Sequence, residues 1–119
     1  MSHRTSALSF AIFATECQRL AKLWGLNEWD IRLRHSNLPD ALAVCEPRAV
    51  SRIGVIRLSK TWGDDCPTPA ALKAAARHEM AHMVTGELIS LGRARYVTDD
   101  EMTAAIEMTA QRLERLLPK

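Results

Sequence analysis

The sequence has few cysteines and no long hydrophobic run. Its three cysteines, Cys17, Cys45 and Cys66, are odd in number, lie far apart and form no C-x-x-C pair. This spacing argues against a disulfide framework and against a cysteine zinc site. In the opening MSHRTSALSFAIFATECQRL the residues at 16–19 interrupt any long apolar run, which argues against a signal peptide or a membrane span. These absences predict a protein of the reducing cytoplasm that makes no contact with a membrane.

An excess of one charge is also absent. The net charge is +2, which falls well short of the footprint of a nucleic-acid-binding protein, so we expect no direct nucleic-acid binding. With 47% hydrophobic and 25% charged residues and no low-complexity tract, the composition is that of a globular protein. The 119 residues predict a single domain, 1–119. Nothing in the sequence indicates an oligomeric state.

The N-terminal segment has the periodicity of an amphipathic helix. Apolar residues recur at steps of three and four, and Gly25 follows as a stop signal, which predicts a helix of about 18 residues. The apolar stripe consists of Phe10, Phe13, Cys17, Leu20 and Trp24.

Strand patterns follow this helix. Apolar residues alternate with charged ones in WDIRLRH (29–35), and the segments ALAVCE (41–46) and SRIGVIRLS (51–59) indicate two further strands. Since NLPD (37–40) supplies turn residues, the economical arrangement is a small antiparallel meander of three or four strands.

Two more helices complete the prediction. Thr68 and Pro69 suit the start of a helix that should run to Thr85 and stop at Gly86. Thr98 and Glu101 match a capping box that opens a last helix, which ends before Pro118. The predicted class is α+β. Its elements are an N-terminal helix, a small antiparallel sheet, the helix from Pro69 to Thr85 and a C-terminal helix.

The segment ARHEMAH (76–82) places His78, Glu79 and His82 in the pattern H-E-x-x-H. Residues four apart lie on one face of a helix, so the two imidazoles can bind one metal ion. A zinc ion held in this way needs a third protein ligand and keeps one position for water, whose proton Glu79 would accept.

Chance alone would produce this pattern in about one such chain in a hundred. The context favours a functional motif, because it lies inside a helix with its own start signal and among small or apolar neighbours such as Ala75, Ala81 and Met83. Polar groups at an apolar helix centre need partners, and a metal ion is one.

The third ligand has several candidates. A metzincin site would need histidine at position 88 and glycine at 85, where the chain has leucine and threonine. His35 ends the first predicted strand, Glu101 is expected in the capping box, and Glu114 lies in a terminal turn that can fray. Glu107 is the best choice, because it lies mid-helix at the edge of the buried stripe. Periodicity alone does not distinguish it from an ordinary exposed glutamate.

H-E-x-x-H on one helix and a glutamate on the next, about twenty-five residues later, resembles the gluzincin group of zinc metallopeptidases. The short chain and the strands before the motif resemble its smallest members, the minigluzincins and SprT-like proteins, many of them from phages and mobile elements. The segment IEMTAQRLERLLP (106–118) is also similar to the glutamate helix of phage-repressor-cleaving metalloproteases.

The resemblance implies a zincin-like fold and hydrolysis of a peptide or protein substrate. By this comparison His78, His82 and Glu107 bind Zn²⁺, and Glu79 is the general base. It also implies that a strand before the active-site helix, here expected to be 51–59, offers its exposed edge to an extended peptide.

Two further positions bear on the site. Larger gluzincins commonly have aspartate four residues after the glutamate ligand, whereas this chain has Gln111, which puts the support of a histidine ligand in doubt. Tyr96, the single tyrosine, is a candidate for stabilising an oxyanion, and the alternative is that it packs ahead of the last helix.

Two other hypotheses compete with the peptidase. One is a non-catalytic binding or regulatory module of zincin fold with structural zinc, and the other is a helical protein in which the motif is incidental. Glu79 favours the enzyme, because a structural zinc site needs no general base.

Overall fold

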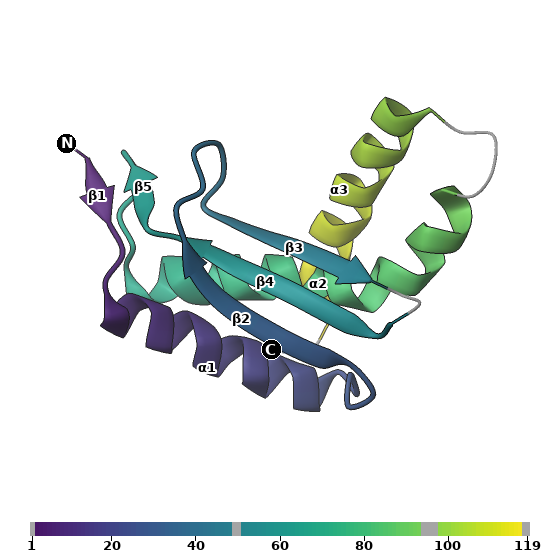
Figure 1. Ribbon diagram of the computed structural model, residues 1–119, viewed down its shortest axis with the longest axis horizontal. Coiled ribbons are helices and arrows are strands. Elements are labelled where there is room, and N and C mark those ends of the chain that lie inside the picture. Colours follow the sequence, from purple (N-terminus) through teal and green to yellow (C-terminus); the bar gives the residue numbers. More distant parts are fainter. Residues whose placement is uncertain (1, 49–50, 94–97, 118–119) are drawn as a thin grey trace.

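The computed structural model of the protein describes residues 2–48, 51–93 and 98–117. Over these ranges the chain has an α+β fold (Figure 1). Its helices are α1 (Ala7–Leu23), α2 (Pro69–Arg93) and α3 (Asp99–Leu116). Its strands are β1 (His3–Arg4), β2 (Asp30–Ser36), β3 (Ala43–Arg48), β4 (Ile53–Ser59) and β5 (Thr61–Gly63).

Helix α1 confirms the prediction from its apolar stripe. Ser6 is the N-cap, and its hydroxyl accepts the amide N–H of Ser9. At the other end Gly25 has a φ of 71°, the left-handed conformation that glycine adopts without a steric penalty. Phe13, Cys17 and Leu20 of the stripe are fully buried. The stripe is therefore the face by which α1 joins the core.

The main sheet has the order β2-β4-β3, and the predicted antiparallel meander is wrong. Strand β2 pairs with β4 in parallel, from Asp30 opposite Ile53 to Ser36 opposite Ser59. Strand β3 pairs with β4 antiparallel. Consecutive strands pair by default, but here β4 inserts between β2 and β3.

Burial explains why β4 is central. Gly54, Val55 and Ile56 are consecutive and all buried, and β4 has a neighbouring strand on each side. A side chain at position 54 would meet Met83 of α2, since a Cβ there would lie 2.5 Å from the Met83 sulfur. The glycine thus lets α2 approach the middle of the sheet.

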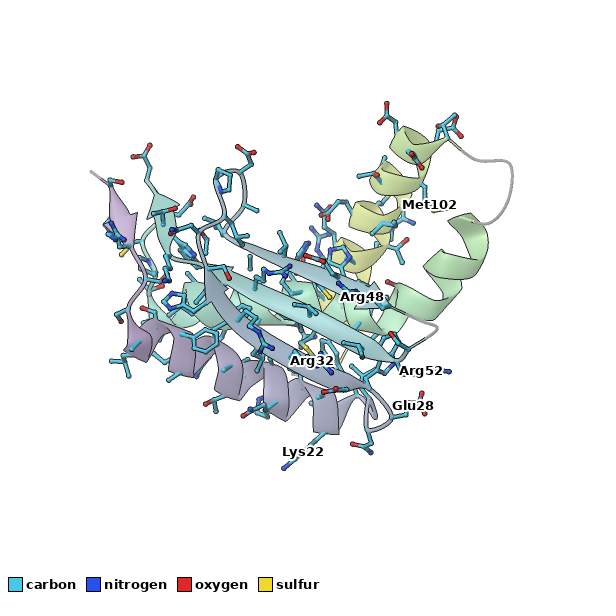
Figure 2. The ribbon with its side chains drawn as sticks, viewed as in Figure 1. Lys22, Glu28, Arg32, Arg48, Arg52 and Met102 are labelled. Carbon is cyan, nitrogen blue, oxygen red and sulfur yellow. The ribbon has the colours of Figure 1, made fainter. Side chains whose placement is uncertain are left out.

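The turn before β4 contains a strained residue. Arg52 has a φ of 56°, which is unfavourable for a side chain with a Cβ. Its guanidinium lies over the Trp29 ring, 5.6 Å from the centroid, and its Nη1 is 3.4 Å from Glu28 Oε1. Figure 2 shows Glu28 and Arg52 at the same corner of the molecule. These contacts hold the turn against the start of β2.

Helix α2 begins as predicted and ends later than predicted. Thr68 caps its N-terminus by accepting the amide N–H of Ala71. The helix does not stop at Gly86 but continues to Arg93. A Cβ at position 86 would lie 2.7 Å from the Cβ of Pro47, so the glycine allows β3 to approach and is not a helix terminator. Glycine serves both purposes, and the sequence pattern does not separate them.

Helices α1 and α2 lie along one face of the main sheet, and α3 packs on α2 beyond β3 (Figure 1). The core joins Phe13 and Leu20 of α1 to Ile56 and Leu58 of β4 and to Met80 of α2. Helix α2 contacts α1, β3 and α3, and so it has neighbours on several sides. The H-E-x-x-H motif lies on this central helix.

Candidate metal centre

Helix α2 presents the two histidines of the motif side by side. The ring centroids of His78 and His82 are 5.0 Å apart, with the rings nearly perpendicular. The His82 side chain is 10% exposed and the His78 side chain 24% exposed. Burial lowers the pKa of His82, against the opposing effect of the Glu107 carboxylate. A lowered pKa favours the neutral imidazole, which is the form that binds metal ions.

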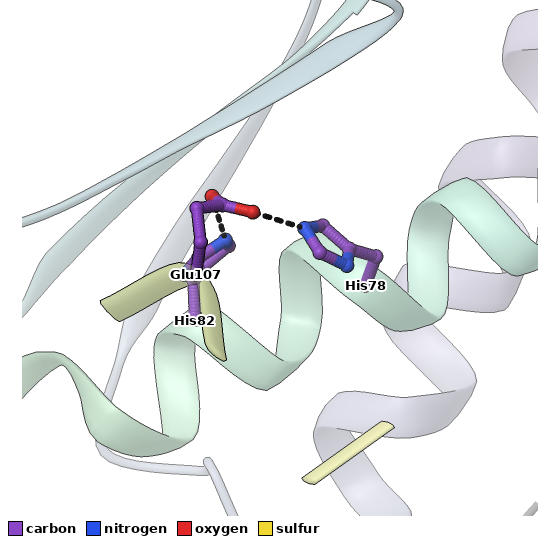
Figure 3. Close-up of side chains that lie close together, drawn as sticks. All are labelled: His78, His82 and Glu107. Carbon is purple, nitrogen blue, oxygen red and sulfur yellow. Dashed lines mark ion pairs between the residues drawn. The ribbon is translucent and has the colours of Figure 1, made fainter. Parts of the chain in front are cut away.

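Glu107 of α3 reaches both histidines. One carboxylate oxygen is 3.3 Å from His78 Nε2, and the other is 3.2 Å from His82 Nε2 (Figure 3). Ligand atoms of the three residues all lie within 4.8 Å of one another, so this group can hold a metal ion. Around a tetrahedral zinc ion with bonds of about 2.0 Å, neighbouring ligand atoms are separated by about 3.3 Å. The nitrogen–oxygen distances therefore suit a common ion.

Glu79 lies in the same cleft and is almost completely buried. Burial raises the pKa of its carboxyl group to about 8, and the carboxylates of Glu107 and Glu114 add to this effect. An isolated anion here is unfavourable because the surroundings solvate it poorly. The site thus combines three potential ligands with one carboxyl group held among them.

Glu114 is the residue whose role the sequence did not predict. It was considered only as a third ligand, but its Oε2 lies 3.1 Å from His78 Nδ1, on the opposite side of the ring from Glu107. No pattern in the sequence signals this contact, because it depends on how α3 crosses α2. Position 111, where larger gluzincins have aspartate, carries an exposed glutamine.

The cleft over these residues has a volume of about 460 Å³. The chain from Ala41 to Pro47, which includes most of β3, forms one wall, and α2 and α3 supply the others. Segment 51–59 was expected to be the edge strand along the cleft, and this is wrong, because β4 is paired on both sides. Within the described residues β3 is the edge strand at the cleft.

The other candidate residues lie elsewhere. His35 is in β2, where its ring stacks on Phe10 and its Nε2 is 2.7 Å from Thr5 Oγ1. Glu101 is exposed at the start of α3, where its amide N–H donates to the Thr98 hydroxyl. Tyr96 lies outside the described residues, and so its predicted role stays a prediction.

Comparison of the chain with protein-family models, curated proteins and solved structures gives no significant match. Among the helices of the described ranges, none combines the length and the apolar character needed to cross a membrane.

Proposed function

We propose that the chain is a zinc-dependent metallopeptidase with a zincin-like arrangement of the gluzincin type. The observation that carries this proposal is the Glu107 carboxylate between His78 and His82, with Glu79 in the same cleft. A helix bearing H-E-x-x-H, a glutamate from the following helix and a small sheet beside them are the parts that such an enzyme needs.

Two imidazole nitrogens and one carboxylate oxygen are a donor set that suits zinc. His78, His82 and Glu107 would hold the ion. A zinc ion bound there supplies an acidified water and polarises the scissile carbonyl group. Half of the Glu107 side chain is exposed, which leaves this side of the site open to the cleft.

Glu79 would move the proton. Its carboxylate would accept a proton from the attacking water and deliver it to the nitrogen of the leaving group. A buried position favours this role, because it keeps bulk water from competing for the proton. Structural zinc sites are closed by four protein ligands and need no such group, so Glu79 supports the enzyme over a non-catalytic zinc module.

We infer that the substrate is an extended peptide that pairs with β3. An edge strand offers unpaired backbone groups to an incoming strand. Ala43 and Cys45 line the cleft with small side chains, which leaves room for a substrate next to α2. Pro47 has no N–H, so the pairing would weaken toward this end of β3. Backbone pairing reads the shape of a peptide more than its sequence.

The decisive experiment compares the wild type with Glu79→Gln. Both proteins should retain zinc after purification, measured by mass spectrometry of the metal content, and only the wild type should cleave a fluorescently labelled unstructured protein. Glu101→Gln, at an exposed position on α3, controls for the loss of a carboxylate and should cleave as the wild type does. Equal cleavage by the wild type and Glu79→Gln would refute the enzyme. Zinc binding without cleavage by any of the three would favour the non-catalytic module.

The ligand set is tested separately by Glu107→Ala. This variant should bind zinc at least about tenfold more weakly in competition with a chelator, because it removes the carboxylate between the two histidines. His82→Ala should lose zinc as well. A wild type without zinc affinity would leave the motif incidental.

A further inference from the structure

His78 contacts a carboxylate on each side of its ring. Nε2 lies 3.3 Å from Glu107, and Nδ1 lies 3.1 Å from Glu114. The two carboxylates differ in exposure, since the Glu107 side chain is 50% exposed and the Glu114 side chain 26%. We propose, on the basis of the proposed function, that Glu114 is a positioning residue that fixes the orientation and tautomer of the His78 ring.

The chemistry of the ring supports this assignment. A neutral imidazole has one N–H and one free lone pair, whereas a carboxylate only accepts hydrogen bonds. When Nδ1–H donates to Glu114, the lone pair is on Nε2, which faces His82 and Glu107. The metal-facing nitrogen is then free to bind a cation, and the carboxylate behind the ring makes it a better donor.

The crossing of α2 and α3 brings Glu114 to this position. Glu107 contacts both histidines, and Glu114, seven residues further along α3, contacts only the earlier one. Moving forward along α3 thus corresponds to moving backward along α2. Seven residues make about two turns, so the two glutamates lie on the same side of α3. Gln111 lies between them in sequence and is exposed.

Arg77 anchors the turn of α3 that carries Glu114. Its Nε donates to the carbonyl oxygen of Glu114, and its Nη2 donates to that of Leu117. These carbonyls belong to the end of a helix, where partners within the helix are lacking. The guanidinium also lies over the Trp24 ring, 5.2 Å from its centroid. Two neighbouring residues of α2 therefore hold Glu114. Arg77 binds the backbone of Glu114, and His78 contacts the Glu114 side chain.

This anchoring answers the objection that the last turn of α3 can fray. Because Arg77 donates a hydrogen bond to the backbone of Glu114, the Glu114 carboxylate is held next to His78. The chain therefore provides an orienting carboxylate at position 114, although position 111 is glutamine. Loss of such an outer partner lowers metal affinity by about 10- to 100-fold in other metal sites.

The test compares Glu114→Ala and Glu114→Gln with the wild type, with Gln111→Ala and Asp100→Asn as controls. Gln111 is the exposed residue at the alternative position, and Asp100 is an exposed acid on the same helix. The first measurement is the tautomer of His78, read by ¹⁵N NMR of the histidine rings in zinc-free protein that also carries Glu107→Ala, because the Glu107 carboxylate would otherwise accept a proton from Nε2. The second is zinc affinity in competition with a chelator, and thermal unfolding reports on the stability of each variant.

With Glu107→Ala alone, and with either control substitution added to it, His78 should carry its proton on Nδ1. Adding Glu114→Ala should remove this preference while the His82 signals stay unchanged. Glu114→Ala alone should lower zinc affinity at least about tenfold. Glu114→Gln should keep the tautomer, because an amide oxygen still accepts from Nδ1–H, and should lose less affinity. It also retains the side-chain volume, so if Glu114→Ala does not fold, a loss of zinc affinity in Glu114→Gln that Gln111→Ala and Asp100→Asn do not show decides the matter.

Two results would overturn the proposal. One is an unchanged His78 tautomer when Glu114→Ala is added to Glu107→Ala, and the other is the same loss of zinc affinity in Asp100→Asn as in the Glu114 variants. Failure of the proposed function is separate, because it would appear as a wild type that binds no zinc or cleaves nothing. The tautomer measurement needs neither zinc nor a substrate and judges Glu114 in either case.

Discussion

Replacing Glu79 with glutamine should change how the stability of the protein depends on pH when divalent metal ions are removed with a chelator. Burial raises the pKa of the Glu79 carboxyl group to about 8 in the folded chain, against its ordinary value of 4.5. The folded state therefore binds this proton more tightly than the unfolded state. Between these two values the unfolded state loses the proton first, so the free energy of unfolding falls as the pH rises.

The size of the effect follows from the two pKa values. Each pH unit between them removes about 1.4 kcal/mol, which gives about 2 kcal/mol at pH 6 and about 3 kcal/mol at pH 7. Stability from this group is fully present below pH 4.5, and the loss is complete above about pH 8. Glutamine is neutral throughout and has nearly the same shape. Glu79→Gln should therefore gain stability relative to the wild type across this window.

Urea unfolding followed by circular dichroism, in chelator and at a series of pH values from 4 to 8, measures this difference. The same substitution at the exposed Glu101 controls for the chemical change alone. The reasoning is wrong if the wild type and Glu79→Gln lose stability in parallel, since Glu79 would then ionise alike in the folded and unfolded chains.

Three further outcomes test the fold and its cysteines. Gly86→Ala should destabilise the protein by about 1 kcal/mol or more in urea unfolding, because crowding against the rigid Pro47 ring outweighs the gain of about 1 kcal/mol in helix propensity; a stabilised variant would contradict the close approach. Thr98→Ala should cost about 1 kcal/mol through loss of the N-cap, whereas Thr103→Ala, exposed inside the same helix, should not; equal losses would remove the cap from the argument. Alkylation followed by mass spectrometry should label the exposed Cys66 first, because burial raises the pKa of the Cys17 and Cys45 thiols; early labelling of Cys17 would refute this order.

Local signals in the sequence were sufficient where one helix or one turn decided the outcome. The apolar stripe of α1, the N-cap at Thr68 and the N-cap at Thr98 all lie where the sequence predicted. His78 and His82 share a face because four residues make about one helical turn. Glu107 was chosen from its place on the last helix and from a resemblance, and the structure brings it to both histidines.

Non-local relations were beyond the sequence. The insertion of β4 between β2 and β3 depends on pairing between segments that are far apart in the chain, although the continuous burial of Gly54, Val55 and Ile56 left a trace in the apolar run GVI. Gly86 could mark the end of a helix or a close contact between elements, and the sequence does not distinguish the two. Glu114 could not be assigned to His78 without the crossing of the two helices, which the carbonyl contacts of Arg77 help to set.

The packing of α3 on α2 ties the two carboxylates beside His78 to the position of one helix. Because Glu107 and Glu114 both come from α3, undocking of this one helix would deprive His78 of both carboxylates at once. A cation held by Glu107 and the two histidines would act as a crosslink between α2 and α3. Hydrogen exchange in α3 should therefore slow when zinc is added, and the rate of metal release should follow the rate at which the helix lifts away.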